Sequence, residues 1–526
     1  MTPRPEGAVA RRGVLTMIVA AAVLGGAGSL GLLTAAQSAG PPIMYHGNGA
    51  SAVPPPPAIP PDVSGEVVTG QPFADPPIIE GAGGQLQLGL TASAAPVTVS
   101  GKRVNGRVYS AEANGVTYPG AFMPPVIRLR RGQQLVVNLQ NELQEATNIH
   151  THGFFVSPTG NQDDIYELIL PGGSAQHVYR NTRFLNPGTY WYHPHVHPLA
   201  EAQVFGGMSG LIEVEGLKSM LPRPLRGISE HYIGLKDFQA TAGNTIPTDD
   251  IDSDAPTTRT VNGLVNPVMT MRAGETQLWH VGNIGADIWY HLQASGLRLT
   301  VLAVDANPVA KPYAARTLMM PPARRFDLLV QAPRAGTYEL ITRRMSTGPQ
   351  GDTYPRTTLM TVKVEGAASA PVARTPATFG GQGDLADRHV ARRRTFVLSE
   401  NAAGTRFFIN GKPFPGAVPM SATPVTGTVE EWTFINTSGE QHPIHIHVND
   451  MQLMSVNGRR QPDDSWIDTI PVPATSKGVP GHVVVRMSFR TYTGPYVFHC
   501  HILAHEDNGM MANINVTSRP FAPAVR

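Results

Sequence analysis

The sequence predicts an all-β protein made of three consecutive β-sandwich domains. Its composition, with 41% apolar and 15% charged residues, 54 glycines and 48 prolines, is typical of a globular, turn-rich chain. Its 526 residues exceed the size at which one hydrophobic core stops growing, so several domains are expected. A pattern of turns and short strands also recurs three times, which sets the expected number of domains.

The first 40 residues predict an export signal. Arg11 and Arg12 precede an uncharged stretch, rich in Ala, Gly and Leu, that extends to about Ala39, and this layout resembles a twin-arginine signal peptide. An uncleaved membrane anchor is the alternative, because the apolar stretch is long enough to span a bilayer. We therefore expect a protein outside the cytoplasm, whether periplasmic, attached to the cell envelope or secreted, that uses the export machinery for folded proteins.

The charge distribution argues against a nucleic-acid partner. Residues 1–40 hold three arginines and one glutamate, which equals the formal net charge of +2 of the whole chain. The remainder is close to neutral and contains no polybasic run.

Residues 41–95 predict an extended linker. They are rich in Pro, Gly and Ala, with four consecutive prolines from Pro54 to Pro57, and show little apolar periodicity.

A repeat defines the three expected domains, over residues 96–222, 223–368 and 369–526. Each contains an Asn-Gly turn, a strand, a glycine turn, a second strand and an asparagine. These landmarks are Asn114-Gly115, Gly132 and Asn141; Asn262-Gly263, Gly274 and Asn283; and Asn410-Gly411, Gly427 and Asn436. Their length and content indicate β-sandwiches.

A later landmark separates the outer domains from the middle one. A glycine at 188, 336 and 494 is followed two residues later by tyrosine, and five residues after it stand His193, Ile341 and His499. We therefore expect the first and third domains to bind metal and the second to act as a spacer without metal.

Cys500, the only cysteine, lies between His499 and His501, with His505 and Met510 further on. A lone cysteine is most often a small buried apolar residue, but a thiolate, two imidazoles and a distant thioether are the ligands of a blue-copper electron-transfer site. On a strand, the flanking imidazoles point to the face opposite the thiol. The cysteine is thus expected to bind one metal while its neighbours bind others.

Four His-x-His pairs strengthen the metal prediction. Each pair presents two imidazoles on one face of a strand, and two pairs fall in each outer domain. They are His150/His152, His193/His195, His445/His447 and His499/His501. If the outer domains pack together, eight imidazoles converge and could hold several metal ions.

From Val97 to Thr517 the chain resembles the multicopper oxidases, the laccase and bilirubin-oxidase family. The motifs that carry this resemblance are His150-Thr-His-Gly153, His193-Pro-His195, His442-Pro-Ile-His-Ile-His447 and His499-Cys-His-Ile-Leu-Ala-His505, followed by Met510. The resemblance implies cupredoxin-like Greek-key sandwiches and four copper ions: one type 1, one type 2 and two type 3. The chain departs from the family pattern at two positions. Thr151 stands where tryptophan is frequent, and Pro194 has no backbone N–H to donate to a neighbouring strand.

The resemblance also implies a ligand for each position. His442, Cys500 and His505 would bind the type 1 copper, with Met510 as its weak axial ligand, and His150 and His445 the type 2 copper. His152, His193 and His501 would bind one type 3 copper, and His195, His447 and His499 the other. Electrons would pass from the type 1 site through Cys500 to His499 and His501, and dioxygen would be reduced to water.

Oxygen reduction consumes protons, so a carboxylate near the cluster is expected. Glu506, next to His505, resembles the acid of bacterial members. Asp163 or Asp164 resembles a second one, although a turn role for these aspartates is as plausible.

The expected function is therefore a laccase-like oxidoreductase that oxidises phenols, aromatic amines or similar small reductants with oxygen as acceptor. One alternative is a metal oxidase of copper(I), manganese(II) or iron(II) in copper homeostasis, which would need acidic or methionine ligands beside the type 1 site; the sequence shows no clear cluster of them. Another is a non-enzymatic copper-binding envelope protein.

Overall fold

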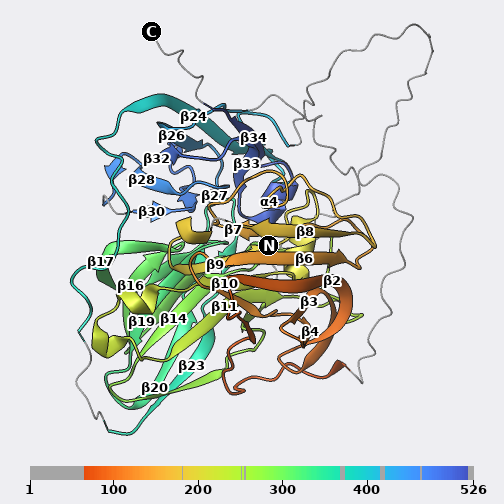
Figure 1. Ribbon diagram of the computed structural model, residues 1–526, viewed down its shortest axis with the longest axis vertical. Coiled ribbons are helices and arrows are strands. Elements are labelled where there is room, and N and C mark those ends of the chain that lie inside the picture. The colour runs from red at the N-terminus through yellow and green to blue at the C-terminus, as the bar shows by residue number, and fades with distance from the viewer. Residues whose placement is uncertain are drawn as a thin grey trace, which may run out of the picture. The chain divides into compact units, whose positions relative to one another are not determined.

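The computed structural model describes residues 64–518 except 181, 250, 254–255, 368–373, 415–420 and 463–464. The predicted export signal and residues 41–63 of the predicted linker lie outside these residues. The described chain is all-β, with sheets that follow one another in sequence (Figure 1). In this part of the chain no helix is long and apolar enough to cross a membrane.

The first sandwich consists of two five-stranded sheets. One has the order β1 (Ile78–Ile79), β5 (Val126–Leu129), β10 (Gly210–Val214), β9 (Gly188–His193) and β7 (His150–His152). The other has the order β4 (Val116–Ala121), β3 (Lys102–Ala113), β2 (Gln85–Val99), β6 (Gln134–Asn141) and β8 (Ser174–Tyr179).

The second sandwich pairs a six-stranded with a five-stranded sheet. The first has the order β12 (Thr258–Val261), β11 (Glu230–Phe238), β14 (Thr276–Asn283), β19 (Arg325–Gln331), β16 (Arg298–Val304) and β17 (Asn307–Ala315). The second has the order β13 (Val268–Arg272), β23 (Thr357–Glu365), β20 (Gly336–Thr342), β15 (Tyr290–Ala294) and β18 (Leu318–Met320), and β21 (Met345–Ser346) forms a hairpin with β22 (Thr353–Tyr354).

The third sandwich pairs a seven-stranded with a four-stranded sheet. The first has the order β25 (Phe407–Ile409), β24 (Val390–Glu400), β26 (Thr428–Asn436), β32 (Gly481–Phe489), β28 (Met451–Val456) and β29 (Arg459–Arg460), with β30 (Trp466–Ile467) against β28. The second has the order β31 (Thr469–Val472), β27 (His442–Ile446), β33 (Gly494–Cys500) and β34 (Met511–Val516).

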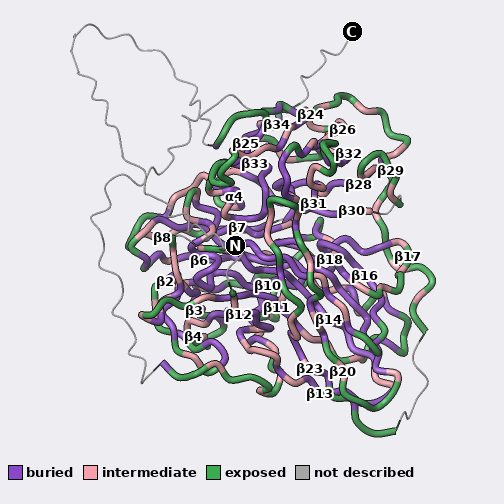
Figure 2. The backbone as a smooth tube through the Cα atoms, turned by 180° about the vertical axis from the view of Figure 1, so that it is seen from behind, coloured by how far each residue is buried: buried purple, intermediate pink, exposed green. Residues whose placement is uncertain are grey.

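The helices whose full extent lies within the described residues are short and lie in connections. They are η1 (Thr182–Phe184), α2 (Ala200–Gly206), α3 (Leu217–Met220), η2 (Arg223–Leu225) and α4 (Leu503–Asp507). One buried apolar cluster includes side chains from all three sandwiches, such as Leu88, Trp279 and Phe498, and buried backbone runs through the centre of each (Figure 2). The prediction of an all-β, three-sandwich chain is confirmed.

The repeat landmarks adopt equivalent conformations. Asn114, Asn262 and Asn410 all have φ near +54°, and the glycine after each also has positive φ, which is the geometry of a type I′ hairpin turn. The later asparagines, at 141, 283 and 436, end β6, β14 and β26, and each is fully buried. Their amides donate to loop carbonyls while their side-chain oxygens accept from the residue two positions on. Each thus stabilises the loop that follows its strand.

The predicted linker over 41–95 is wrong at its C-terminal end. Residues 85–95 belong to β2, which pairs with β3 and β6, and β1 pairs with β5. The alternation of buried and exposed residues in Gln85–Leu90 is the strand signal. The glycines and alanines around it hid that signal.

A buried ionic network joins the first sandwich to the second. His280 on β14 contacts Asp327 through Nδ1 at 2.5 Å and Glu230 through Nε2 at 3.1 Å, and Thr189 of β9 also donates to Asp327. Burial lowers the pKa of His280, but the hydrogen bonds to Asp327 and Glu230 outweigh it and raise the pKa to about 10. His280 is therefore a cation at neutral pH.

We expect His280→Gln to destabilise the protein by about 3–5 kcal/mol at neutral pH, because it leaves the fully buried carboxylate of Asp327 without its cation. The stabilisation from the raised pKa is fully present below pH 6.5, falls as the pH rises and is lost above pH 10. Thermal unfolding of the wild type and of His280→Gln between pH 6.5 and pH 10 tests this pH dependence. A difference in Tm that grows with pH would contradict the assignment.

Candidate metal centre

Matching strand pairs present the histidines of the outer sandwiches. In the first, β7 pairs with β9 so that His150 is opposite His193. In the third, β27 pairs with β33 so that His445 is opposite His499. Because alternate residues of a strand share a face, each strand pair directs its imidazoles to one side, and the two sets converge between the sandwiches.

The structure brings the eight paired histidines into three groups whose candidate ligand atoms lie within 4.8 Å of one another. They are His150, His152 and His445; His152, His193 and His501; and His195, His447 and His499. In the last group the three Nε2 atoms are 3.1–3.3 Å apart. The two three-histidine groups that the resemblance assigns to type 3 copper thus each lie together, and His150 and His445 lie together in the remaining group.

A fourth group forms on the other face of β33. The Sγ of Cys500 is 3.7 Å from Nδ1 of both His442 and His505, and these two nitrogens are 3.2 Å apart. Met510 is fully buried, and its carbonyl accepts from the Cys500 amide at 2.9 Å. The helix α4 between them turns the chain back, which returns Met510 to this group.

The donor atoms fit metal ions. Within the described residues, Nε2 of His150, His193 and His445 and both ring nitrogens of His501 are buried without a hydrogen-bond partner. Buried polar atoms normally have partners, so unpaired ones need an explanation such as a bound ion. The thiolate–imidazole set suits copper, and the all-imidazole sets suit copper or zinc.

Burial keeps these imidazoles neutral. It lowers the pKa of His195 and of His442 to about 3, and neighbouring histidines add to the effect at His152, His445 and His501. A neutral imidazole keeps the lone pair that binds a metal. Burial raises the pKa of the Cys500 thiol, which favours the protonated form when no metal is bound. A metal ion binds the thiolate, so metal binding releases this proton.

Asp163, and not Asp164, contacts the cluster. Its carboxylate accepts from Nδ1 of His150 at 2.8 and 3.0 Å and from the amide of Thr151 at 2.9 Å. Asp164 instead accepts from the amide of Tyr166. Asp163 therefore orients His150 with Nε2 free, and Thr151, where the family often has tryptophan, helps to anchor that carboxylate.

We expect Asp163→Asn to weaken binding of the ion held by His150 by about 10–100-fold, the usual cost of removing a hydrogen-bond partner of a ligand. Asp164→Asn makes the same chemical change one residue away and should leave binding unchanged. Copper content after dialysis against graded chelator measures both variants. Equal copper loss from the two would refute the role of Asp163.

Glu506 lies on the opposite side of the cluster. It is fully buried, with Oε2 at 2.8 Å from Nδ1 of His499 and Oε1 at 3.4 Å from Nδ1 of His195. Burial favours the neutral acid, but His195 and His499 outweigh it and hold the pKa of Glu506 well below its ordinary value. Glu506 is thus a buried base beside two candidate ligands.

Other parts of the sequence prediction gain a structural basis or a correction. Pro194 follows the last residue of β9, so it ends the strand and leaves the hydrogen bonds between the strands intact.

The sequence prediction missed two carboxylates near the candidate ligands. Asp468 lies 3.3 Å from Nε2 of His152, and Glu440 lies 3.5 Å from Nε2 of His505. Asp468 is a charged residue within the apolar run Trp466–Ile470, which was its only local signal.

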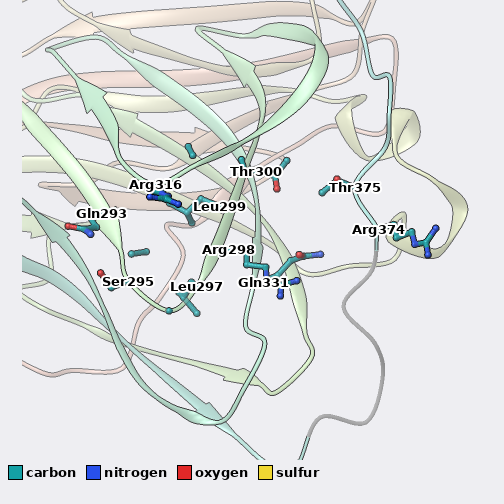
Figure 3. A pocket seen from close by; sticks show the side chains of 14 residues that line it. Gln293, Ser295, Leu297, Arg298, Leu299, Thr300, Arg316, Gln331, Arg374 and Thr375 are labelled. Atoms are coloured by element: carbon teal, nitrogen blue, oxygen red, sulfur yellow. The ribbon is translucent and has the colours of Figure 1, made fainter.

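A separate cavity of about 550 Å³ lies in the middle sandwich (Figure 3). Arg298, Gln331 and Arg374 are among its lining residues, and no histidine is. It therefore does not belong to the metal centre.

Comparison with known proteins decides the family. Three family models, each described as multicopper oxidase, match successive parts of the chain, residues 102–219, 229–367 and 388–520. The chain is a multicopper oxidase. This family binds copper, and the oxidase is an oxidoreductase that uses oxygen.

Individual relatives agree with this assignment. The oxidase is 26% identical over 427 residues to a multicopper oxidase of Staphylococcus aureus, covering 77% of this chain and 84% of that protein. It is 25% identical over 471 residues to a laccase of Bacillus subtilis, covering 76% and 90%. A solved multicopper oxidase from Campylobacter jejuni, described as a metallo-oxidase, superposes with a TM-score of 0.72 at 23% identity over 88% of this chain and 98% of that one. This last likeness supports the cupredoxin-like fold of the oxidase.

Proposed function

We propose that the protein couples one-electron oxidation of small reductants, such as phenols and aromatic amines, to the four-electron reduction of dioxygen to water. It would hold one type 1, one type 2 and two type 3 coppers, with the ligands that the resemblance implies. Copper ions in these groups supply the one-electron redox chemistry. The observation that supports this most directly is the position of Cys500 in the chain between His499 and His501, which joins the thiol group to the histidine groups by covalent bonds.

The side chains of the protein have distinct tasks in this proposal. His505, 8% exposed, is the least buried of the twelve expected ligands and would face the reductant. The eight paired histidines are at most 2% exposed, so they exclude bulk water from the cluster. Asp163 would orient His150 by accepting from its Nδ1, and Glu506, with Oε2 at 2.8 Å from Nδ1 of His499, would move protons to the cluster.

Copper stoichiometry, visible absorption and oxygen uptake on a phenol test the proposal together. We expect about four coppers per loaded chain, a blue type 1 absorption and oxygen consumption without release of hydrogen peroxide. Fewer coppers would contradict the ligand sets. Copper binding without oxygen uptake would favour the copper-binding envelope protein.

Glu440 supports a second candidate, oxidation of a metal ion. It contacts Nε2 of His505, and burial together with the charges of Asp352, Glu400 and Asp287 raises the pKa of Glu440 to about 8. Such a carboxylate beside the expected type 1 ligand could bind a cationic reductant, and the Campylobacter jejuni protein is described as a metallo-oxidase.

Oxygen uptake with copper(I), iron(II), manganese(II) and a phenol separates the two candidates. For a metal oxidase, Glu440→Gln would slow oxidation of the metal ion and leave phenol oxidation unchanged. For an oxidase of phenols, neither the metal ions nor this variant would have a specific effect.

We also propose that the protein works outside the cytoplasm. The support is the paired arginines before an apolar stretch at the N-terminus. Cell fractionation of the wild type and of a variant with Arg11 and Arg12 replaced by lysine tests export, and N-terminal sequencing of the exported protein distinguishes a cleaved signal from an anchor.

A further inference from the structure

The middle sandwich contributes no histidine to the cluster, but it directs one arginine to the junction with both outer sandwiches. Arg325, the first residue of β19, is fully buried. Its Nε donates to the carbonyl of Thr189 in the first sandwich at 3.0 Å. Its Nη1 and Nη2 donate to the two carboxylate oxygens of Asp468 in the third sandwich at 2.9 and 2.7 Å. One guanidinium therefore contacts all three sandwiches.

Asp468 passes this contact on to two candidate copper ligands. Its Oδ1 is 3.3 Å from Nε2 of His152, and its backbone carbonyl accepts from Nδ1 of His445 at 2.8 Å. The two rings stack with centroids 3.8 Å apart. These contacts leave Nδ1 of His152 and Nε2 of His445 without a hydrogen-bond partner among the described residues. Asp468 thus selects which nitrogen of each ring is available to an ion.

A second carboxylate fixes the position of this ion pair. Asp305 accepts from the backbone amide of Arg325 at 2.9 Å through Oδ1 and from that of Asp468 at 3.3 Å through Oδ2. Both partners are therefore held through their backbone as well as their side chains. A bidentate arginine–carboxylate pair of this kind has little freedom to rotate.

The backbone of the first histidine motif is packed against the same pair. A Cβ on Gly153, directly after His152, would lie 2.8 Å from Oδ2 of Asp468 and 2.9 Å from Nη2 of Arg325, and Gly153 has φ of +86°. Only glycine allows the ion pair to approach the chain this closely at that conformation. This close contact explains why the residue after His152 in the His-Thr-His-Gly motif is glycine.

We propose that Arg325 is a positioning residue for the copper cluster, which it controls from the sandwich without copper ligands. By holding Asp468, it fixes the orientation of His152 and His445, one ligand from each outer sandwich. The middle sandwich then does more than separate the outer two. This inference rests on the proposed copper cluster.

A stabilising role alone does not explain the arrangement. Buried ion pairs are often no more stabilising than apolar side chains of similar size. The distinguishing property of the pair is its fixed, bidentate geometry next to ligand rings. Metal affinity and the spectrum of the bound metal are therefore the informative measurements.

The test replaces Arg325 with lysine, which keeps the charge but loses the bidentate fork. Its matched control is Arg394→Lys. Arg394 makes a bidentate pair with Glu430 in the third sandwich, at 2.6 and 2.9 Å, and the described residues show no contact between this pair and a candidate ligand. Each variant is loaded with copper and dialysed against graded chelator, and bound copper and the type 2 electron paramagnetic resonance signal are recorded.

We expect Arg325→Lys to lose cluster copper at about a 10-fold lower chelator concentration than the wild type, with an altered type 2 signal. Arg325→Met should extend this to about 100-fold. Both variants should keep the blue type 1 absorption, and Arg394→Lys should match the wild type. Wild-type retention and signal in Arg325→Lys, or equal copper loss in Arg394→Lys, would overturn the proposal. A wild type that binds no cluster copper would instead refute the proposed function.

Discussion

Cys500→Ser is expected to abolish the blue absorption and lower oxygen uptake by about 10⁴-fold or more, the scale on which removal of an obligatory member of a catalytic unit acts. The substitution removes the thiolate that faces His442 and His505 and leaves His499 and His501 unchanged on the other face of β33. The variant should therefore still bind copper at the eight paired histidines. Visible absorption, copper content and oxygen uptake on one preparation check all three expectations.

Ser438→Ala is the matched control for this site. The Ser438 hydroxyl lies 2.7 Å from Nε2 of His442, so its loss affects the orientation of a ligand and removes none. It should keep the blue absorption and most of the activity. A Cys500→Ser protein that oxidised phenols at the wild-type rate would disprove electron entry through this group.

Glu506→Gln is expected to lower turnover by about 10²–10⁴-fold at full copper occupancy, the range typical of a lost general acid or base. A glutamine has one acceptor oxygen, whereas the carboxylate faces both His499 and His195. It also cannot take up and release a proton. Oxygen uptake should be measured on preparations with matched copper content, because weaker metal binding would otherwise imitate the effect.

Asp507→Asn provides the comparison, since it makes the same change at the next residue of α4. Asp507 accepts from the backbone amide of Glu201 and lies 3.6 Å from His197, away from the paired histidines. We expect wild-type turnover from it. If both variants lost activity equally, the effect would belong to the helix and not to Glu506.

Much of the site could be predicted because its residues follow the period of a strand. His-x-His pairs on short strands must share a face, so the convergence of eight imidazoles followed from the spacing and from the repeat that aligns His193 with His499. The Asn-Gly turns could be predicted for the same reason, since their left-handed conformation is a local property of those two residues.

The residues that sequence reasoning missed interact over long distances in the chain. Asp468 meets Arg325 and His152 only after three sandwiches have folded, and Glu440, just before β27, meets His505 of α4 only after the third sandwich has folded. Which of the adjacent residues Asp163 and Asp164 directs its carboxylate to His150 depends on the local backbone conformation, and sequence spacing does not determine that conformation. The start of β2 was missed because its glycine- and alanine-rich surroundings resemble a linker.

The division of the histidine groups between β7 and β9 on one side and β27 and β33 on the other has a thermodynamic consequence. An ion bound jointly by His195, His447 and His499 would cross-link two segments that are separated by the entire middle sandwich. Such a cross-link closes a long loop, and its loop-closure entropy would be lost from the unfolded ensemble only while the ion is bound. Copper binding and the association of the outer sandwiches would then be linked equilibria. Removal of copper by a chelator would lower the free energy of unfolding of the whole protein as well as empty the cluster.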